Sequence, residues 1–198
     1  MDKTYLVADA RFCDAVAARE SNMSVNDYNQ TIVQNINSTV DENDTILFIG
    51  DIGRYKNKEK INECINSIVA KTKKCVDMRF QPSFNTREKL SEIGIERGYS
   101  VDGFVKDTVY DTKYFVVITS DYEYYKKLFN KPDEEEYKYY YAMPASVYPF
   151  SKLLDNKCFN ISISEWGLSP IEYNSLPLLI DNAKVFERME ESEHESNI

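Results

Sequence analysis

The chain has 198 residues, of which 42% are hydrophobic and 13% aromatic, and its formal net charge is −9. This length suits one α/β domain with its own core and is short for two, and the fifteen Tyr and ten Phe argue against a chain that is disordered throughout. The acidic balance argues against a duplex-binding groove, which usually shows as a basic patch, and fits a soluble protein, a partner with a basic surface or a mimic of nucleic acid.

The first half of the chain alternates between predicted strands and predicted helices. The apolar run Thr4–Ala8 is typical of a buried strand, and Ser24 with Asp27 forms a helix N-cap signature, followed by apolar residues at helical spacing over residues 24–39. Further along, we predict strands over residues 45–49 and 74–78, and helices over 58–70 and 86–97, the last capped by Asn85 and ended by Gly98.

The second half is richer in strand signal. Runs of β-branched and aromatic residues predict strands over residues 104–109, 114–119, 137–141 and 158–163, and a final helix is predicted over 176–188. We expect a single domain over residues 1–188 and an acidic flexible tail over 189–198. Strands that first alternate with helices and then follow one another favour a mixed sheet, or two sheets, flanked by helices.

The cysteines and the hydropathy of the chain indicate the cellular compartment to expect. The four cysteines, Cys13, Cys64, Cys75 and Cys158, are scattered and form no Cys-x-x-Cys pair, which indicates neither a disulfide framework nor a zinc motif. No apolar signal-peptide core follows the first residues, and no apolar run approaches the ~20 residues of a membrane span. We therefore expect reduced thiols and a cytoplasmic location, in the host cytoplasm if the protein is viral, with no membrane association.

Three phrases of the sequence carry a resemblance to a known family. The first predicted strand ends in Asp9-Ala10-Arg11, and the second lies within Asn43-Asp44-Thr45-Ile46-Leu47-Phe48-Ile49-Gly50-Asp51. Downstream, Asn160-Ile161-Ser162-Ile163-Ser164-Glu165 precedes Trp166 and then Ser169-Pro170-Ile171. In this order the phrases resemble the calcineurin-like metallophosphoesterases, especially the small phage-type members. The likeness spans roughly residues 4–180 and implies an α/β fold in which two mixed β-sheets pack as a sandwich flanked by helices.

The chemistry of that family requires two metal ions, which activate a water molecule and clamp the phosphate. The resemblance implies that the ligands come from loops at the strand ends, and this sequence departs from the pattern at most of those positions. Asp9 and Asp51 match family ligands, but Arg11 replaces the His of Asp-x-His. The segment that begins at Arg79 replaces Gly-Asn-His-Asp, Ser120 stands where a His is expected, and residues 142–146 take the place of Gly-His-x-His.

A second observation does not depend on any alignment. The chain contains one His, His194, and it lies in the predicted tail. The imidazoles of a dinuclear centre, or of a Ser-His-Asp or Cys-His device, are therefore missing from the predicted domain. Neither a P-loop nor a dinucleotide-binding glycine turn is present. We predict a non-catalytic chain without catalytic residues, bound metal or cofactor.

The retained acids allow two hypotheses. Asp9 and Asp51 could hold a single hard cation such as Mg²⁺ through carboxylate oxygens and water. Alternatively, the guanidinium of Arg11 lies near both carboxylates and relieves their repulsion without a metal. We favour the second hypothesis.

The segment over residues 121–148 is the predicted binding region, because it combines many tyrosines with an acidic run. Tyrosine buries a large area at a small cost in side-chain entropy, and neighbouring acids steer a basic partner. Alternatively, part of these tyrosines belong to a strand and the core, and the acids to a solvated loop. The candidate contacts are Tyr122, Tyr124, Tyr125, Asp133, Glu134, Glu135, Glu136 and Tyr137.

The sequence thus predicts a pseudo-phosphoesterase that binds another protein, as an inhibitor or a subunit of a complex, with a viral origin as the expectation. Direct binding to nucleic acid is not expected. One alternative is a residual metal-dependent phosphoesterase that uses Asp9 and Asp51. Another is an acidic mimic of nucleic acid that occupies a host enzyme.

Overall fold

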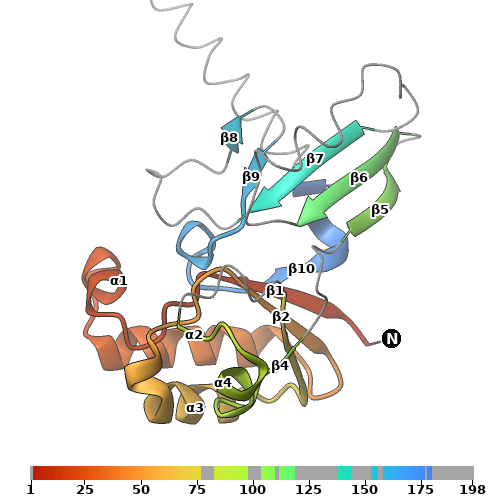
Figure 1. Ribbon diagram of the computed structural model, residues 1–198. Helices are drawn as coiled ribbons and strands as arrows, with labels where there is room; N and C mark the ends of the chain where they lie inside the picture. Colours follow the sequence, from red (N-terminus) through yellow and green to blue (C-terminus); the bar gives the residue numbers. More distant parts are fainter. Residues whose placement is uncertain are drawn as a thin grey trace, which may run out of the picture.

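The computed structural model describes residues 2–76, 83–97, 104–109, 112–118, 138–143, 153–155, 158–176 and 178–179. Its N-terminal part is built on a five-stranded mixed sheet with the strand order β10-β1-β2-β3-β4 (Figure 1). The strands are β1 (Thr4–Ala8), β2 (Thr45–Ile49), β3 (Thr72–Cys75), β4 (Glu96–Arg97) and β10 (Ile171–Glu172). β1 to β4 are parallel, and β10 runs antiparallel to β1 at the edge.

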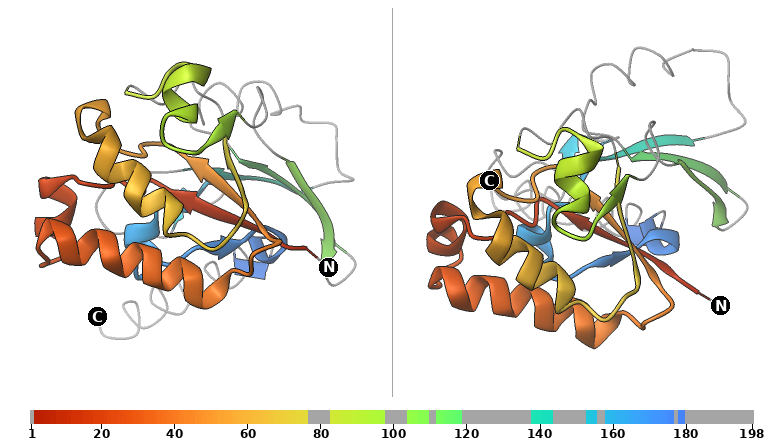
Figure 2. Two further views of the ribbon diagram at one scale, coloured as in Figure 1. Left: turned by 90° about the horizontal axis from the view of Figure 1, so that it is seen from below. Right: turned by 60° about the horizontal axis from the view of Figure 1, so that its bottom comes forward.

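Four helices cover one face of this sheet (Figures 1 and 2). They are α1 (Ala15–Glu20), α2 (Val25–Thr39), α3 (Lys58–Asn66), which follows the 3₁₀ turn η1 (Tyr55–Asn57), and α4 (Arg87–Ser91). Tyr5, Val7 and Phe48 from the strands share one buried cluster with Ile32 of α2 and Ile61 of α3. This core fixes α2 and α3 side by side beneath the first two strands.

The opposite face of the sheet is also buried. Alternate residues of the same strands, such as Leu6 and Leu47, join a second cluster with Phe159, Ile161 and Ile171. Because both faces of β1 and β2 are covered, these strands are continuous apolar runs rather than alternating ones.

The remaining strands pair with one another in the order β5-β6-β7-β9-β8. They are β5 (Phe104–Val109), β6 (Thr112–Ile118), β7 (Lys138–Met143), β8 (Leu153–Asp155) and β9 (Cys158–Asn160). The chain leaves β9 toward the first sheet, where Ser162 forms a parallel bridge with Ala8 at the end of β1. Two 3₁₀ turns, η3 (Ile163–Trp166) and η4 (Tyr173–Ser175), then flank β10. Residues 158–162 therefore connect this set of strands to the carboxyl end of β1.

The α/β class is confirmed as a five-stranded mixed sheet flanked by helices. β1, β2 and β5 have the predicted bounds. The predicted N-cap is confirmed as well, since Ser24 Oγ accepts from the backbone N–H of Asp27 at 3.2 Å and donates to Asp27 Oδ2 at 2.7 Å.

The predicted helix over 86–97 is wrong in its extent. α4 ends at Ser91, its N-cap is Thr86 rather than Asn85, and the chain is already extended in β4 at residue 96. Gly94, with φ of 73°, turns the chain. The buried Leu90 and Ile93 lie at helical spacing, but the buried Ile95 follows after the turn, only two residues beyond Ile93.

Other boundaries also differ. The helix predicted over 58–70 ends at Asn66, β3 begins two residues before the predicted 74, and the strand predicted over 158–163 leaves its ladder after Asn160. The short elements α1, β8 and β10 were not predicted. The predicted helix over 176–188 falls mostly, and the tail over 189–198 wholly, outside the described residues. In the part of the chain that the structure describes, no helix has the length and apolar character needed to cross a bilayer.

The loops that follow β1 and β2 are joined through their backbones. Arg11 N donates to Asp51 O at 3.0 Å and Phe12 N to Ile52 O at 2.9 Å, and Phe12 forms a bridge with Gly53. Gly53 has φ of 144°, and a Cβ built on it would lie 2.6 Å from Phe12 O. Only glycine permits this close approach of the two loops.

Gly53→Ala should therefore destabilise the fold by ~3 kcal/mol, because it adds a backbone clash to a conformation that side chains avoid. Gly167→Ala is the matched control, since Gly167 has φ of 61° but nothing within 4 Å of the added Cβ, and it should cost only ~1 kcal/mol. Urea unfolding of the three proteins measures both values. Equal losses for the two variants would contradict the required contact at Gly53.

Candidate functional site

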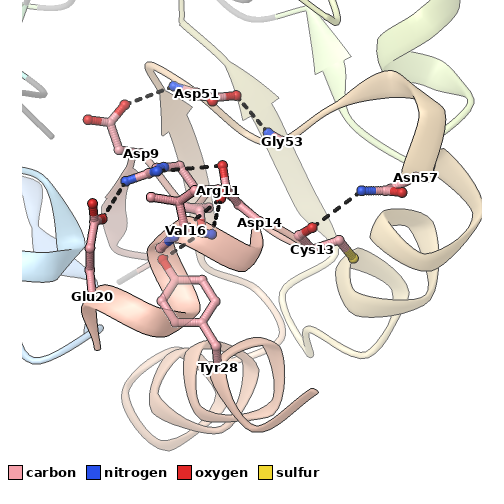
Figure 3. A network of polar contacts seen from close by, with 12 residues as sticks. Asp9, Arg11, Cys13, Asp14, Val16, Glu20, Tyr28, Asp51, Gly53 and Asn57 are labelled. Atoms are coloured by element: carbon pink, nitrogen blue, oxygen red, sulfur yellow. Dashed lines mark hydrogen bonds and ion pairs between the residues drawn. The ribbon is translucent and has the colours of Figure 1, made fainter. Parts of the chain in front are cut away.

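Asp9 and Asp51 lie together at the carboxyl ends of the neighbouring parallel strands β1 and β2 (Figure 3). The carboxyl ends of parallel strands share one edge of the sheet, and in open α/β sheets this edge is where ligands usually bind. The backbone N–H of Asp51 donates to Asp9 Oδ1 at 2.8 Å. The two acids that the sequence singled out are thus in direct contact.

The Asp9 carboxylate is buried, with only 7% of the residue exposed, and both of its oxygens accept hydrogen bonds from the protein. Oδ1 takes the N–H of Asp51, and Oδ2 takes the hydroxyl of Ser162 at 2.8 Å. Burial of a charged group is costly unless such donors replace water. The carboxylate is therefore anchored by two segments that are distant in the sequence.

Ser162 and Asn160 complete a buried polar cluster with Asp9, and both are fully buried. Asn160 Oδ1 accepts from Ser162 N at 3.0 Å, and Asn160 O accepts from Trp166 Nε1 at 3.1 Å. The Trp166 ring packs on Phe159, with 5.4 Å between the ring centroids. Sequence reasoning quoted these residues only as part of a family phrase. Two polar side chains within an otherwise apolar run were the signal that could have marked them as site residues.

Asp51 is partly buried, and its environment is different. Its Oδ1 accepts from the N–H of Gly53 at 2.9 Å (Figure 3). Burial raises the pKa of Asp51 above its ordinary value, and the nearby Asp9 adds to this, whereas the Gly53 hydrogen bond and Arg11 lower it. Because the net direction is upward, the fold favours the ionised form of this carboxyl less than water does.

Arg11 lies at the same edge, but its ion pairs are not to the two acids that we expected it to neutralise. Its guanidinium lies 3.1 Å from Glu20 Oε2 and 3.5 Å from Asp14 Oδ2 (Figure 3). Burial lowers the pKa of Arg11. Asp14 and Glu20 together raise this pKa by more than burial lowers it, so it lies above its ordinary value. Both ion pairs thus tie Arg11 to α1 and its N-cap Asp14. Its charge also lowers the pKa of Asp51, so the hypothesis that Arg11 relieves the repulsion of Asp9 and Asp51 stays a prediction.

The loop after β1 is strained. Asp9, Arg11 and Cys13 are non-glycine residues in the left-handed region, with φ of 52°, 46° and 61°. Such residues cost of the order of 1–3 kcal/mol each and persist where surrounding contacts enforce them. One such contact is the hydroxyl of the buried Tyr28, which donates to Ala10 O at 3.2 Å, and burial raises the pKa of Tyr28 to about 12.

Asp44, the other acid of the phrase that resembles the family, lies at the opposite end of β2. Its carboxylate accepts from Lys3 N at 2.7 Å and from Asp41 N at 2.9 Å. Asp44 therefore shapes the turn that leads into β2. It does not belong to a site at the carboxyl edge, by which we mean the side of the sheet where β1 and β2 end.

The other predicted site residues lie outside the described part of the chain. These are Arg79, Ser120, Tyr122, Tyr124, Tyr125, Asp133, Glu134, Glu135, Glu136 and Tyr137, together with His194. The binding segment over 121–148 stays a prediction.

The described side chains do not fit a dinuclear metal centre. Among them, no group of three or more His, Cys, Asp and Glu residues could hold a metal ion. At the carboxyl ends of β1 and β2, the described side chains offer two carboxylates. Each oxygen of Asp9 already accepts a hydrogen bond from the protein. This set falls short of two metal ions, whereas one hard cation could use two carboxylates and complete its coordination with water.

Comparisons with known proteins support the fold of this chain and give no information about its chemistry. No protein-family model and no curated protein match this chain. Among solved structures, it is similar to AQ665, a protein of unknown function from Aquifex aeolicus, with a TM-score of 0.60 and 11% identity. The match covers 90% of this chain and 100% of the other. At this identity, the likeness shows a shared α/β fold alone.

Ser162→Ala should cost ~1–3 kcal/mol of stability, because the buried Asp9 carboxylate loses one of its hydrogen-bond donors. Ser38→Ala is the control, since the Ser38 hydroxyl is exposed on α2, and it should change stability by less than ~0.5 kcal/mol. Urea unfolding at pH 7 gives both values. If Ser162→Ala were as mild as the control, the hydroxyl would not be stabilising Asp9.

The raised pKa of Asp51 predicts a pH dependence of stability. The folded state takes up the Asp51 proton more readily than the unfolded chain, so stability gains from this group as pH falls from neutral through its raised pKa, and the gain is complete below its ordinary value near 3.8. Asp51→Asn keeps an oxygen acceptor for Gly53 and removes the pH-dependent contribution of this carboxyl to stability. The stability of the variant relative to the original protein should thus be highest at pH 7 and decline on acidification. Unfolding curves at several pH values measure this difference, and a constant difference would contradict the pKa direction.

Proposed function

We propose that this chain is a non-catalytic protein related in fold to the calcineurin-like metallophosphoesterases, with two sheets packed as a sandwich between helices, and that it acts by binding another protein. The phrases around Asp9 and Asp51 support the relationship. They fall at the carboxyl ends of adjacent parallel strands, where the family would place its first two metal ligands.

The observation that carries the proposal is the bonding of the Asp9 carboxylate. A main-chain N–H and a serine hydroxyl occupy its two oxygens at 2.8 Å each. These donors stabilise the buried charge in the way that a cation would. The acid at the end of β1 thus has a structural role that needs no metal.

The number of histidines in the chain supports the same conclusion. The single His of the chain is His194, far along the sequence from both acids. Two-metal catalysis requires a set of ligands that holds both ions and lowers the pKa of a bound water. Among the described residues, the two carboxylates at this end of the strands do not by themselves provide that set.

A residual phosphoesterase is the second candidate, and Asp51 is the observation that favours it. Its carboxyl is partly buried beside Asp9, and its pKa is raised, so that a cation at this edge would stabilise its ionised form. A single Mg²⁺ completed by water would suit such a pair.

The binding role draws on the charge of the chain and on its tyrosine-rich segment. A formal net charge of −9 favours a partner with a basic surface. The Tyr and Glu residues over 121–148 are the proposed contact, and the partner is another protein that this chain inhibits or joins in a complex. A mimic of nucleic acid would use the same charge, and competition with DNA distinguishes it.

One experiment with two measurements tests the proposal. The purified chain is incubated with bis(4-nitrophenyl) phosphate and Mn²⁺ or Mg²⁺, beside Asp9→Asn, and both proteins should release no more nitrophenol than metal alone. Hydrolysis that chelation stops and that Asp9→Asn lacks would instead establish the residual enzyme.

The second measurement is capture of a partner from the native source. A variant with Tyr124→Ala, Tyr125→Ala, Glu134→Gln, Glu135→Gln and Glu136→Gln should lose the captured protein. The control for lost charge is Glu42→Gln, Glu59→Gln and Glu88→Gln, three exposed acids in the turn before β2, on α3 and on α4, and it should retain the partner. Release of the partner by added DNA would assign mimicry, and unchanged capture by the first variant would remove the segment from the interface.

A further inference from the structure

A groove of about 640 Å³ runs between α2 and α3, which lie side by side on the helix side of the sheet (Figure 2). Ligand sites commonly enclose ~300–1,000 Å³, so this space suits a ligand of moderate size. Most of the side chains that line it end in a carboxamide, a hydroxyl or a charged group. Neither Asp9 nor Asp51 lines it, so the groove is a site apart from the acids at the carboxyl edge.

Carboxamides fix the groove at both ends. At one end, Cys13 N donates to Asn29 Oδ1 at 2.9 Å, and Asn57 Nδ2 donates to Cys13 O at 3.3 Å (Figure 3). These bonds join α2 and the start of α3 through the loop after β1. At the other end, Asn37 Nδ2 donates to Ser67 O at 2.8 Å, which joins the last turn of α2 to the end of α3. A groove whose walls are already fixed costs less ordering when a ligand binds.

Three further carboxamides on the α2 wall take no part in holding the fold. Asn26, Gln30 and Gln34 line the groove, and all three residues are exposed. In the described part of the chain, none of these three side chains forms a hydrogen bond. A carboxamide has a carbonyl acceptor and N–H donors, which are the two functions that a peptide group also presents. These side chains can therefore pair with the main chain of a ligand.

The spacing of the three carboxamides matches an extended chain. Residues four apart on a helix lie on one face and are ~6 Å apart along its axis. In an extended chain, every second residue points the same way, and this repeat is ~6.6 Å. The steps from Asn26 to Gln30 and from Gln30 to Gln34 thus follow successive dipeptides of an extended ligand. The whole row covers ~12 Å, the length of about four extended residues.

The floor of the groove is apolar. Val25, Val33 and Cys64 line it, and these partly buried side chains also pack against the core between the helices and the sheet. Where a protein binds an extended peptide, main-chain hydrogen bonds provide affinity and alternate side chains enter apolar depressions. This floor suits small aliphatic side chains at alternate positions of the ligand.

The remaining lining residues favour a peptide over other ligands. Lys60 and Glu63 carry opposite charges, so the lining has no net charge in a chain whose formal net charge is −9. Among the described residues that line the groove, none is aromatic, whereas nucleobases bind single-strand sites by stacking on aromatic rings. A helical ligand is also unsuited to free carboxamides, because its main-chain groups are already paired with one another.

We propose that this groove binds a short extended segment of another protein, about four residues long and without net charge. The main chain of the segment bonds to the carboxamides of Asn26, Gln30 and Gln34, and its small aliphatic side chains contact the apolar floor. None of these residues belongs to the segment over 121–148, so the inference does not depend on the proposed function.

The test screens a synthetic library of capped hexapeptides, with small aliphatic residues at alternate positions, against the full-length chain. The best binder is then measured by fluorescence anisotropy. Gln30→Leu together with Gln34→Leu should weaken its binding about tenfold, because two hydrogen bonds are lost. The same peptide with an N-methylated main chain should be weakened to a similar extent. In NMR spectra, the side-chain NH₂ signals of Gln30 and Gln34 should shift when the peptide is added.

The matched control is Asn66→Leu, which adds the same apolar side chain at an exposed position on α3 that does not line the groove. It should leave the affinity unchanged, and urea unfolding shows whether each variant is folded. Three results would overturn the proposal. They are the absence of any library member that binds the original chain, undiminished binding of the N-methylated peptide, and a loss in Asn66→Leu equal to that in the glutamine variant.

Discussion

The carboxylate of Asp9 is the point on which the candidate site depends. It is buried at the end of β1, and it accepts from the main chain after β2 and from the hydroxyl of Ser162. A buried charge is tolerated only where donors replace the lost water, so three chain segments must meet at this place. The left-handed backbone of Asp9 and the close approach of Gly53 to Phe12 lie at the same junction.

In a phosphoesterase of this fold, the same side of the sheet would hold the metal ions. In this protein, the charged side chains there pair with one another and with protein donors. Arg11, which stands at a histidine position only in the proposed relationship, pairs with Asp14 and Glu20 and thereby secures α1. Asp14 also caps that helix by accepting from the N–H groups of Val16 and Ala17. Asp9 and Arg11 therefore stabilise a loop junction and a helix, which is the basis for proposing a binding protein rather than an enzyme.

The parts of the fold that the sequence predicted were those with local signals. The buried runs of β1 and β2 and the Ser24 cap follow from hydrophobic pattern and capping chemistry, whereas the adjacency of Asp9 and Asp51 was implied by the family resemblance. Ser162 could not be placed in this way, because its contact with Asp9 joins residues 153 positions apart. The partner Glu20 was missed for a related reason, since it lies on a helix of six residues that has too few turns to show a period.

The helix predicted over 86–97 shows how a local signal can mislead. The buried Ile93 and Ile95 belong to the turn and the approach to β4, and the left-handed Gly94 between them allows the chain to reverse. Tertiary packing decides the structure of this segment, and the pattern of one sequence gives no information about that packing.

The central claim is that protein donors, not cations, stabilise the acids at the carboxyl edge. Thermal unfolding after thorough chelation, with Mg²⁺ or Mn²⁺ then added over a range of concentrations, tests it most directly, because a ligand that binds only the folded state raises Tm by mass action. The midpoint should stay the same at every metal concentration, in the original chain and in Asp9→Asn alike. A rise in Tm with metal concentration that Asp9→Asn abolishes would contradict the claim.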